Sequence, residues 1–209
     1  MILILLGATG AGKGTQAEMV IKEFDLRHLS TGDLLRTAVS NGTNLGKLAK
    51  GFMDSGKLVP DDVIIGIISD YMKEHPGEGV LFDGFPRTVA QAVGLEELLQ
   101  GDELKVVSLV VEDEQVIKRL SARRSCRKCG KIYNPALGIN PAEDSKCFCG
   151  GEIYQRDDDK AKTIANRLNV YHSQTEPVIE FYRGKKLLVE VNGTGSPNEV
   201  FDRVKNALS

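Results

Sequence analysis

Residues 7–15 read GATGAGKGT, a glycine-rich stretch between an apolar run at 1–6 (MILILL) and a segment with helical spacing at 16–24 (QAEMVIKEF). Glycines let the backbone curl so that successive N–H groups point at a polyphosphate, and the N-terminus of the following helix adds partial positive charge. Lys13 stands where the lysine of a phosphate-binding loop reaches the β- and γ-phosphates. The stretch therefore predicts a strand, a phosphate loop and a helix, in that order.

One position departs from the general phosphate-loop pattern. The Ser or Thr expected directly after the lysine, whose hydroxyl would hold Mg²⁺, is replaced by Gly14, and Thr15 follows one place later. We therefore expect Mg²⁺ to be held mostly by phosphate oxygens and water, which this ion tolerates.

Short apolar runs recur at 79–82, 105–111 and 187–191, each with the little alternation typical of buried parallel strands. Amphipathic stretches accompany them at 33–40, 60–74, 88–100, 114–124, 161–183 and 198–208. This alternation predicts an α/β fold with a parallel β-sheet core flanked by helices. Two segments interrupt it, and we expect both to be insertions on the core: short helical pieces at 30–59 and a stretch rich in turn residues and cysteine at 125–155.

The composition is that of an ordinary soluble protein of 209 residues, with 27 Lys and Arg against 29 Asp and Glu and a net charge of −2. This balance gives no general attraction to nucleic acid or to anionic membranes. The run MILILL is too short for a signal segment, and no apolar span of about 20 residues follows. We expect a cytoplasmic enzyme with no nucleic acid or membrane partner, and a monomer, because no surplus apolar face is identifiable.

All four cysteines lie close together in the chain, at Cys126, Cys129, Cys147 and Cys149. Without a secretion signal, this clustering favours a local metal site over two disulfides. A polar insert of about 30 residues also lacks the apolar content to fold by itself. The pattern predicts a four-thiolate zinc site with a structural role, because a closed shell of four ligands leaves no open position for catalysis.

Two further polar clusters lie where strands or helices meet loops. Residues 29–36 (LSTGDLLR) offer hydroxyls and an arginine at a helix start, and residues 82–88 (FDGFPRT) are followed by Gln91. Asp83 is placed to orient water on Mg²⁺, and Arg87 can fork onto a phosphate. Either cluster alone could be a helix cap or a turn with an ion pair, but together they favour a second phosphate-bearing substrate.

With these motifs the sequence resembles the adenylate kinases, which move a phosphoryl group between ATP and AMP. The stretches GATGAGKGTQ, LSTGDLLR, GKLVPD, DGFPRT, RLSARR and YQRDDD match in order, over essentially the whole chain. The resemblance implies a P-loop core at 1–29, 60–121 and 160–209, a helical AMP-binding insertion at 30–59 and a small zinc-ribbon-like lid at 122–159. The family usually has Pro at position 9, where this chain has Thr, and C-x2-C where this chain has Cys147-x-Cys149.

The resemblance also implies substrates (ATP, AMP and ADP), cofactors (Mg²⁺ and structural Zn²⁺) and site residues. The implied ATP site comprises Gly10, Ala11, Gly12, Lys13, Gly14, Thr15, Arg119, Arg123, Ile132, Tyr133 and Gly195. The implied AMP site comprises Thr31, Arg36, Lys57, Leu58, Val59, Gly84, Phe85, Pro86, Arg87, Gln91, Arg156 and Arg167. Gln91 would read the adenine edge, Arg36 and Arg87 would bind the α-phosphate, and the catalytic groups would be Lys13, Arg87, Arg119, Arg123, Arg156 and Arg167.

The chemistry explains why arginines rather than a general base are expected. The second pKa of a phosphate monoester is about 6, so the acceptor is already ionised at neutral pH. His28, His75 and His172 lie in no recognisable motif, and we expect them to be structural or solvated. Closure of the two insertions would exclude water, which competes with AMP for the phosphoryl group.

Two alternatives remain open from the residues. The first is a kinase for UMP, CMP or GMP, against which Gln91 and the long lid argue. The second is a zinc-ribbon module that binds nucleic acid and uses the phosphate loop for regulation. Taken by themselves, Arg119, Arg123 and Arg124 also fit a solvated helix face, since Arg119 and Arg123 are four positions apart on one face.

Overall fold

The computed structural model describes residues 1–99, 101, 103–141 and 146–208. Its larger sheet has five strands in the order β2-β3-β1-β4-β8, all paired in parallel. The strands are β1 (Ile2–Leu6), β2 (Arg27–Ser30), β3 (Val80–Asp83), β4 (Leu104–Val110) and β8 (Leu188–Asn192). The α/β fold with a parallel core that the sequence predicts is therefore confirmed.

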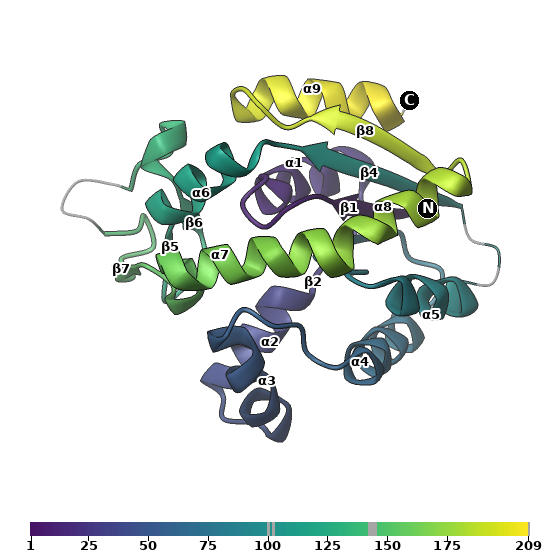
Figure 1. The fold of residues 1–209 in the computed structure, drawn as a ribbon, viewed down its shortest axis with the longest axis horizontal. Helices are drawn as coiled ribbons and strands as arrows, with labels where there is room; N and C mark the ends of the chain where they lie inside the picture. The colour runs from purple at the N-terminus through teal and green to yellow at the C-terminus, as the bar shows by residue number, and fades with distance from the viewer. Residues whose placement is uncertain (100, 102, 142–145, 209) are drawn as a thin grey trace.

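Helices connect and cover these strands (Figure 1). They are α1 (Lys13–Phe24), α2 (Thr31–Ser40), α3 (Asn44–Asp54), α4 (Asp61–Glu74), α5 (Val89–Leu99), α6 (Asp113–Ala122), α7 (Ala161–Val170), α8 (Glu176–Gly184) and α9 (Pro197–Leu208). A π-helical turn, η4 (Tyr171–Thr175), joins α7 to α8. Residue 100 of the expected helix at 88–100 lies outside the described residues. In the described part of the chain, no helix combines the length and apolarity needed to cross a membrane.

Strand β1 lies at the centre of the sheet, and its side chains alternate between two buried layers. Ile2, Ile4 and Leu6 pack on the face covered by α4, α5 and α8. Leu3 and Leu5 pack on the opposite face, against α1 and α9. Because helices cover both faces, the strand can be apolar throughout, which explains the uninterrupted run MILILL.

The segment expected as the first insertion forms α2 and α3, which project away from the sheet (Figure 1). Ser30 caps α2 by accepting from the N–H of Asp33 (3.3 Å), and Thr43 caps α3 by accepting from the N–H of Gly46 (3.0 Å). A Cβ at Gly46 would lie 2.0 Å from the carbonyl oxygen of Ala38, so only glycine allows the two helices to meet this closely.

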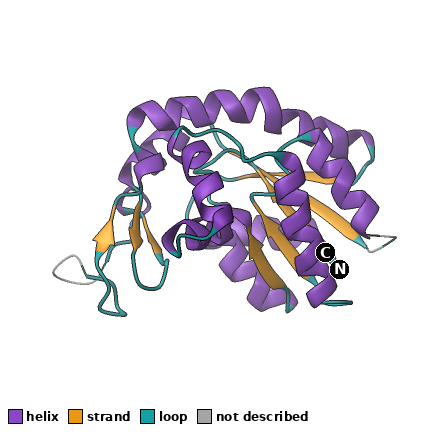
Figure 2. Cartoon of the chain, turned by 90° about the horizontal axis from the view of Figure 1, so that it is seen from below, coloured by secondary structure: helices purple, strands orange, loops and turns teal. Residues whose placement is uncertain are grey.

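The second insertion contains a small antiparallel sheet in the order β6-β5-β7, set apart from the larger sheet (Figure 2). Its strands are β5 (Arg124–Cys126), β6 (Ile132–Tyr133) and β7 (Ile153–Tyr154), with short 3-10 turns at η1 (Pro135–Leu137) and η3 (Asp157–Asp159). Residues 142–145 of the expected lid lie outside the described residues.

Strand β2 is the one strand of the larger sheet that the apolar runs did not predict. It is an edge strand in which only Leu29 is buried, so its sequence, RHLS, has almost no hydrophobic signal. Its pairing sets Ser30 beside Asp83 at the end of β3. This register brings the two polar clusters, 29–36 and 82–88, to the same edge of the sheet.

Candidate active site

The phosphate loop connects the carboxyl end of β1 to the N-terminus of α1, as the sequence predicts. Gly10 and Gly12 have φ angles of 94° and 106°, which L side chains rarely adopt. A Cβ at Gly10 would also lie 2.7 Å from Cγ of Leu120 on α6. These glycines therefore allow a tight loop that leads directly into a helix N-terminus, the geometry that binds phosphate.

Lys13 curls back over this loop. Its Nζ donates to the carbonyl oxygens of Gly7 (2.7 Å) and Ala8 (3.0 Å). Burial lowers the pKa of Lys13 to about 8, against the opposing effect of the Asp83 carboxylate; Arg87, Arg167 and other arginines lower it further. A phosphate beside Nζ would raise this pKa, because a neighbouring negative charge favours the ammonium form.

Asp83 lies at the end of β3, next to the phosphate loop. A Cβ at Gly14 would be 3.5 Å from its Oδ2, so the absence of a side chain at Gly14 leaves space in front of the carboxylate. His28 of β2 lies behind it, with Nε2 3.6 Å from Oδ2, longer than a hydrogen bond. Burial lowers the pKa of His28, but the Asp83 carboxylate outweighs it, so the net shift is upward. Sequence motifs assign no role to His28, because its neighbour Asp83 is 55 positions away.

A cleft runs from the phosphate loop to α2, α3 and α5. It encloses about 980 Å³, part of it open solvent. Of the residues expected to bind AMP, those that line it are Thr31, Arg36, Lys57, Leu58, Val59, Gly84, Pro86, Arg87, Gln91 and Arg167. Lys13 lines the same cleft, so the structure brings the phosphate-loop lysine and most of the expected acceptor residues into one space.

The 82–88 segment is held in shape by hydrogen bonds to its backbone. The carbonyl oxygen of Gly84 accepts from Oγ1 of Thr31 (2.9 Å) and from Nε of Arg87 (2.7 Å). The carbonyl oxygen of Arg87 accepts from Oγ1 of Thr175 in the π-helical turn (2.9 Å). Phe85 lies in the hydrophobic core with no exposed surface, and neither it nor Arg156 is among the residues that line the cleft.

Three arginines are held by partners from η3 and the lid. Arg123 forms a bidentate pair with Asp159, through Nε (2.8 Å) and Nη2 (2.5 Å). Nη1 of Arg167 donates to the carboxylate of Asp158 (2.6 Å). Nε of Arg156 donates to the hydroxyl of a lid serine, Ser125 (2.8 Å). These partners hold the three guanidinium groups in place, and of the three Arg167 lines the cleft.

The electrostatics of these arginines match a site built to receive negative charge. Burial, followed by the charges of neighbouring arginines, lowers the pKa of Arg156 to about 10. Burial also lowers the pKa of Arg167 to about 10, partly offset by Asp158. A guanidinium keeps its charge at neutral pH even with these shifts, so a bound phosphate would meet fixed positive charges.

Arg119 is placed differently from the other arginines. It is 7% exposed, and it donates to the carbonyl oxygens of Ala11 in the phosphate loop (3.0 Å) and of Gly193 after β8 (3.0 Å). It joins the phosphate loop to the segment that contains Gly195, which has a φ of 121°. The structure therefore places Arg119 against the outer side of the loop.

The two expected ATP contacts of the lid also point in different directions. Cδ1 of Ile132 would lie 3.8 Å from a Cβ at Gly14, so Ile132 faces the phosphate loop. The side chain of Tyr133 is buried inside the lid, where its hydroxyl donates to Sγ of Cys147 (3.2 Å).

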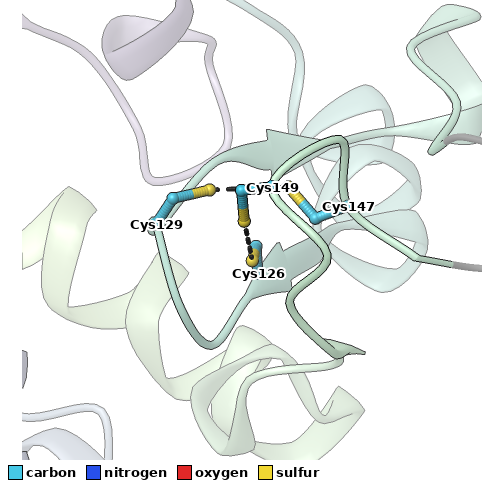
Figure 3. A group of neighbouring side chains, drawn as sticks. All are labelled: Cys126, Cys129, Cys147 and Cys149. Carbon is cyan, nitrogen blue, oxygen red and sulfur yellow. Dashed lines mark hydrogen bonds between the residues drawn. The ribbon is translucent and has the colours of Figure 1, made fainter.

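The four cysteines come together as the sequence predicts, and their side chains point toward one another (Figure 3). Their sulfurs all lie within 4.8 Å of one another, with 3.5 Å between Cys126 and Cys149 and 3.4 Å between Cys129 and Cys147. A tetrahedral zinc ion with Zn–S bonds of about 2.3 Å needs sulfurs about 3.8 Å apart. The hydrogen bond from Tyr133 is the largest of several effects that lower the pKa of Cys147 to about 6. Against a hydrogen bond from the Lys131 backbone, hydrogen bonds with Cys149 and Cys147 raise the pKa of Cys129 to about 12, so the cluster shares protons among its sulfurs until a metal ion displaces them. The residues present therefore fit a zinc ion.

Sequence reasoning missed several residues that contact the expected ones. Asp158 and Asp159 stand in the quoted stretch YQRDDD, but nothing in the sequence tells which arginine each one pairs with. Thr175 lies in the amphipathic stretch 161–183 and carries no motif. Asp61 ends the quoted stretch GKLVPD, but nothing in that stretch indicates its contact with Gln91.

The parallel sheet, the phosphate loop and the arginine-lined cleft that begins at this loop define a nucleotide-binding phosphotransferase. Residues 5–187 match the family model described as adenylate kinase. The chain is 48% identical to the adenylate kinase of Archaeoglobus fulgidus, over 100% of this chain and 98% of that protein. It is 48% identical to the adenylate kinase of Methanothrix thermoacetophila (100% and 99% covered) and 49% identical to that of Caldicellulosiruptor bescii (100% and 97% covered). The chain belongs to the adenylate kinase family, as its motifs indicated.

Proposed function

We propose that this enzyme transfers the terminal phosphoryl group of Mg·ATP to AMP, reversibly, to give two ADP by in-line transfer. The observation that carries the proposal is a single cleft lined both by Lys13 of the phosphate loop and by Arg87, Gln91 and Arg167. A donor phosphate at the loop and an acceptor phosphate at the arginines would share this space.

On the donor side, the N–H groups of residues 10–15 and the ammonium of Lys13 hold the ATP phosphates. The adenine end lies toward Arg119 and Gly195, because Arg119 joins the outer side of the loop to the segment after β8. Ile132 covers the nucleotide from the lid, and Tyr133 contributes through its backbone.

On the acceptor side, Arg36 and Arg87 hold the AMP phosphate and Gln91 meets the base. Support comes from the cleft, since Thr31 and the 57–59 segment line the wall between these groups. Gly84 and Pro86 line the rest of the wall, with Phe85 between them anchored in the core.

Transfer depends on positioning and charge, because the acceptor phosphate needs no base. Arg123, Arg156 and Arg167 exchange their present partners for equatorial oxygens of the transferred group as the lid closes. Fixed donors in a dry cleft stabilise the charge of the transition state without reorganisation.

Two metal ions belong to this proposal. Asp83 would orient the water on Mg²⁺ across the space left by Gly14, while phosphate oxygens and water would supply most ligands of an ion bound with ATP. Zn²⁺, bound by Cys126, Cys129, Cys147 and Cys149, would supply the structural support that the small lid lacks.

The proposal assigns a task to each part of the chain. Residues 1–29, 60–121 and 160–209 form the core, 30–59 close over AMP, and 122–159 close over ATP. We further propose that the enzyme acts as a cytoplasmic monomer without nucleic acid or membrane partners.

Phosphorus NMR tests the reaction directly. With Mg·ATP, the protein is expected to produce ADP from AMP and not from UMP, CMP or GMP in parallel samples, and to form ATP and AMP from ADP alone. Turnover of a different monophosphate would contradict the substrate assignment. No transfer to any monophosphate, with zinc bound, would overturn the proposed function.

A further inference from the structure

The side-chain amide of Gln91 is held by two partners. It lies on α5 with 2% of its surface exposed. Its Oε1 accepts from the backbone N–H of Arg87 (2.8 Å), and its Nε2 donates to Oδ1 of Asp61 (2.7 Å). One N–H of the amide and one lone pair of its oxygen remain available to a ligand.

These two partners can be satisfied in only one orientation of the amide. A backbone N–H can only donate, and a carboxylate can only accept. Rotating the amide of Gln91 by half a turn would set two donors face to face at Arg87 and two acceptors face to face at Asp61. The direction of the Gln91 amide therefore follows from its partners.

Asp61 is itself fixed on both of its carboxylate oxygens. Oδ2 accepts from Oγ1 of Thr88 (2.9 Å), while Oδ1 accepts from Gln91. The hydroxyl of Thr88 in turn accepts from the backbone N–H of Gln91 (3.1 Å). Asp61 lies in the first turn of α4, where the helix dipole favours a negative charge. The network thus links α4 to α5 and holds the Gln91 amide through both its oxygen and its nitrogen.

We propose that Asp61 is a specificity-determining positioning residue, which locks the Gln91 amide so that the cleft selects a 6-aminopurine monophosphate over a 6-oxopurine. The inference rests on the proposed function, in which Gln91 meets the acceptor base. Adenine presents an amino donor beside a ring-nitrogen acceptor, and a 6-oxopurine presents an acceptor beside a ring N–H donor. An amide that cannot rotate matches the first pattern and opposes the second.

The test compares AMP with inosine monophosphate, a 6-oxopurine without a 2-amino group, as acceptors for the unaltered protein and for Asp61→Asn. The asparagine amide can either accept or donate, so one of the two groups that fix Gln91 is lost. We expect the ratio of kcat/KM for AMP to that for inosine monophosphate to fall about fivefold or more. This ratio does not depend on the fraction of active enzyme, so partial unfolding cannot imitate the effect.

Asp62→Asn is the matched control. Asp62 occupies the same first turn of α4 but is exposed, so the change removes the same charge without touching Gln91. Its ratio is expected to equal that of the unaltered protein. In a Gln91→Leu background, Asp61→Asn is expected to leave the ratio unchanged, because Asp61 acts through Gln91.

Three results would overturn the inference: an unchanged ratio in Asp61→Asn, an equal fall in Asp62→Asn, or a further fall in the Gln91→Leu background. If Asp61→Asn gives no folded protein, Thr88→Val removes one partner of the same carboxylate, and an unchanged ratio there overturns the inference as well. Failure of the proposed function is distinguishable, because the unaltered protein would then not phosphorylate AMP at all.

Discussion

Two of the arginines assigned to the transferred phosphoryl group, Arg123 and Arg167, are held by carboxylates before any substrate binds. Asp159 has no exposed side-chain surface, and both of its carboxylate oxygens accept hydrogen bonds from Arg123. Asp159→Asn is expected to lower the free energy of unfolding by about 2 kcal/mol, because Arg123 loses a buried counter-charge while hydrogen bonding is partly kept. The melting temperature should fall by about 4–8 °C. Asp157→Asn, at an exposed neighbouring position, should change the melting temperature little. An equal fall in the melting temperature of both variants would contradict this prediction.

His172 gives a prediction of pH dependence. Its Nδ1 lies 3.0 Å from Oε2 of Glu176 and its Nε2 2.9 Å from Oδ2 of Asp113; hydrogen bonds to Glu176 and then Asp113 raise the pKa of His172. The stabilisation by the protonated imidazole is therefore fully present below about pH 6.5, the pKa of histidine in the unfolded chain. It is lost as pH rises through the pKa of His172 in the folded protein. Thermal melts should show a larger difference between the unaltered protein and His172→Gln at pH 6 than at pH 9. A difference in melting temperature that is equal at both pH values would contradict this prediction.

Among the elements, the lid has little hydrophobic packing of its own and depends more on its four-cysteine site. Its strands are two or three residues long, and its small buried cluster consists of Cys126, Tyr133 and Cys147. Zinc chelation is therefore expected to abolish amide protection in β5, β6 and β7 while β1 and β4 stay protected in hydrogen exchange. Added zinc should restore the lid, which controls for damage by the chelator. Unchanged lid protection in a preparation shown to be free of metal would contradict a structural role.

The elements also show where sequence reasoning succeeds. Strands buried on both faces, such as β1 and β4, are visible in the sequence as apolar runs. The phosphate loop is visible as a fixed spacing of glycines and a lysine. Strand β2 lies at the edge of the sheet with one buried residue, so it has no apolar run from which a strand could be predicted. The contact between Asp61 and Gln91 spans 30 positions and depends on how α4 meets α5. Such partners follow from packing, which local patterns do not encode.

Considering the molecule as a whole, the segment that follows α3 meets α7 through a polar contact, in which Nδ2 of Asn166 donates to the carbonyl oxygen of Ser55 (2.5 Å). We expect this contact to favour the closed cleft. Asn166→Ala should then shift the equilibrium toward the open cleft by the free energy of one exposed hydrogen bond. We expect KM for AMP to rise about threefold, with kcat unchanged or higher because opening releases product.

Asn169→Ala is the matched control for that shift, since Asn169 is the same residue type on the same helix but is exposed. Its KM and kcat should equal those of the unaltered protein. Rapid-quench kinetics adds an independent measurement: if opening limits turnover, the first turnover appears as a burst of ADP, and the burst should shrink in Asn166→Ala. A fall in kcat with an unchanged KM, or a first turnover without a burst, would place the slow step in the transfer itself rather than in the movement of the insertions.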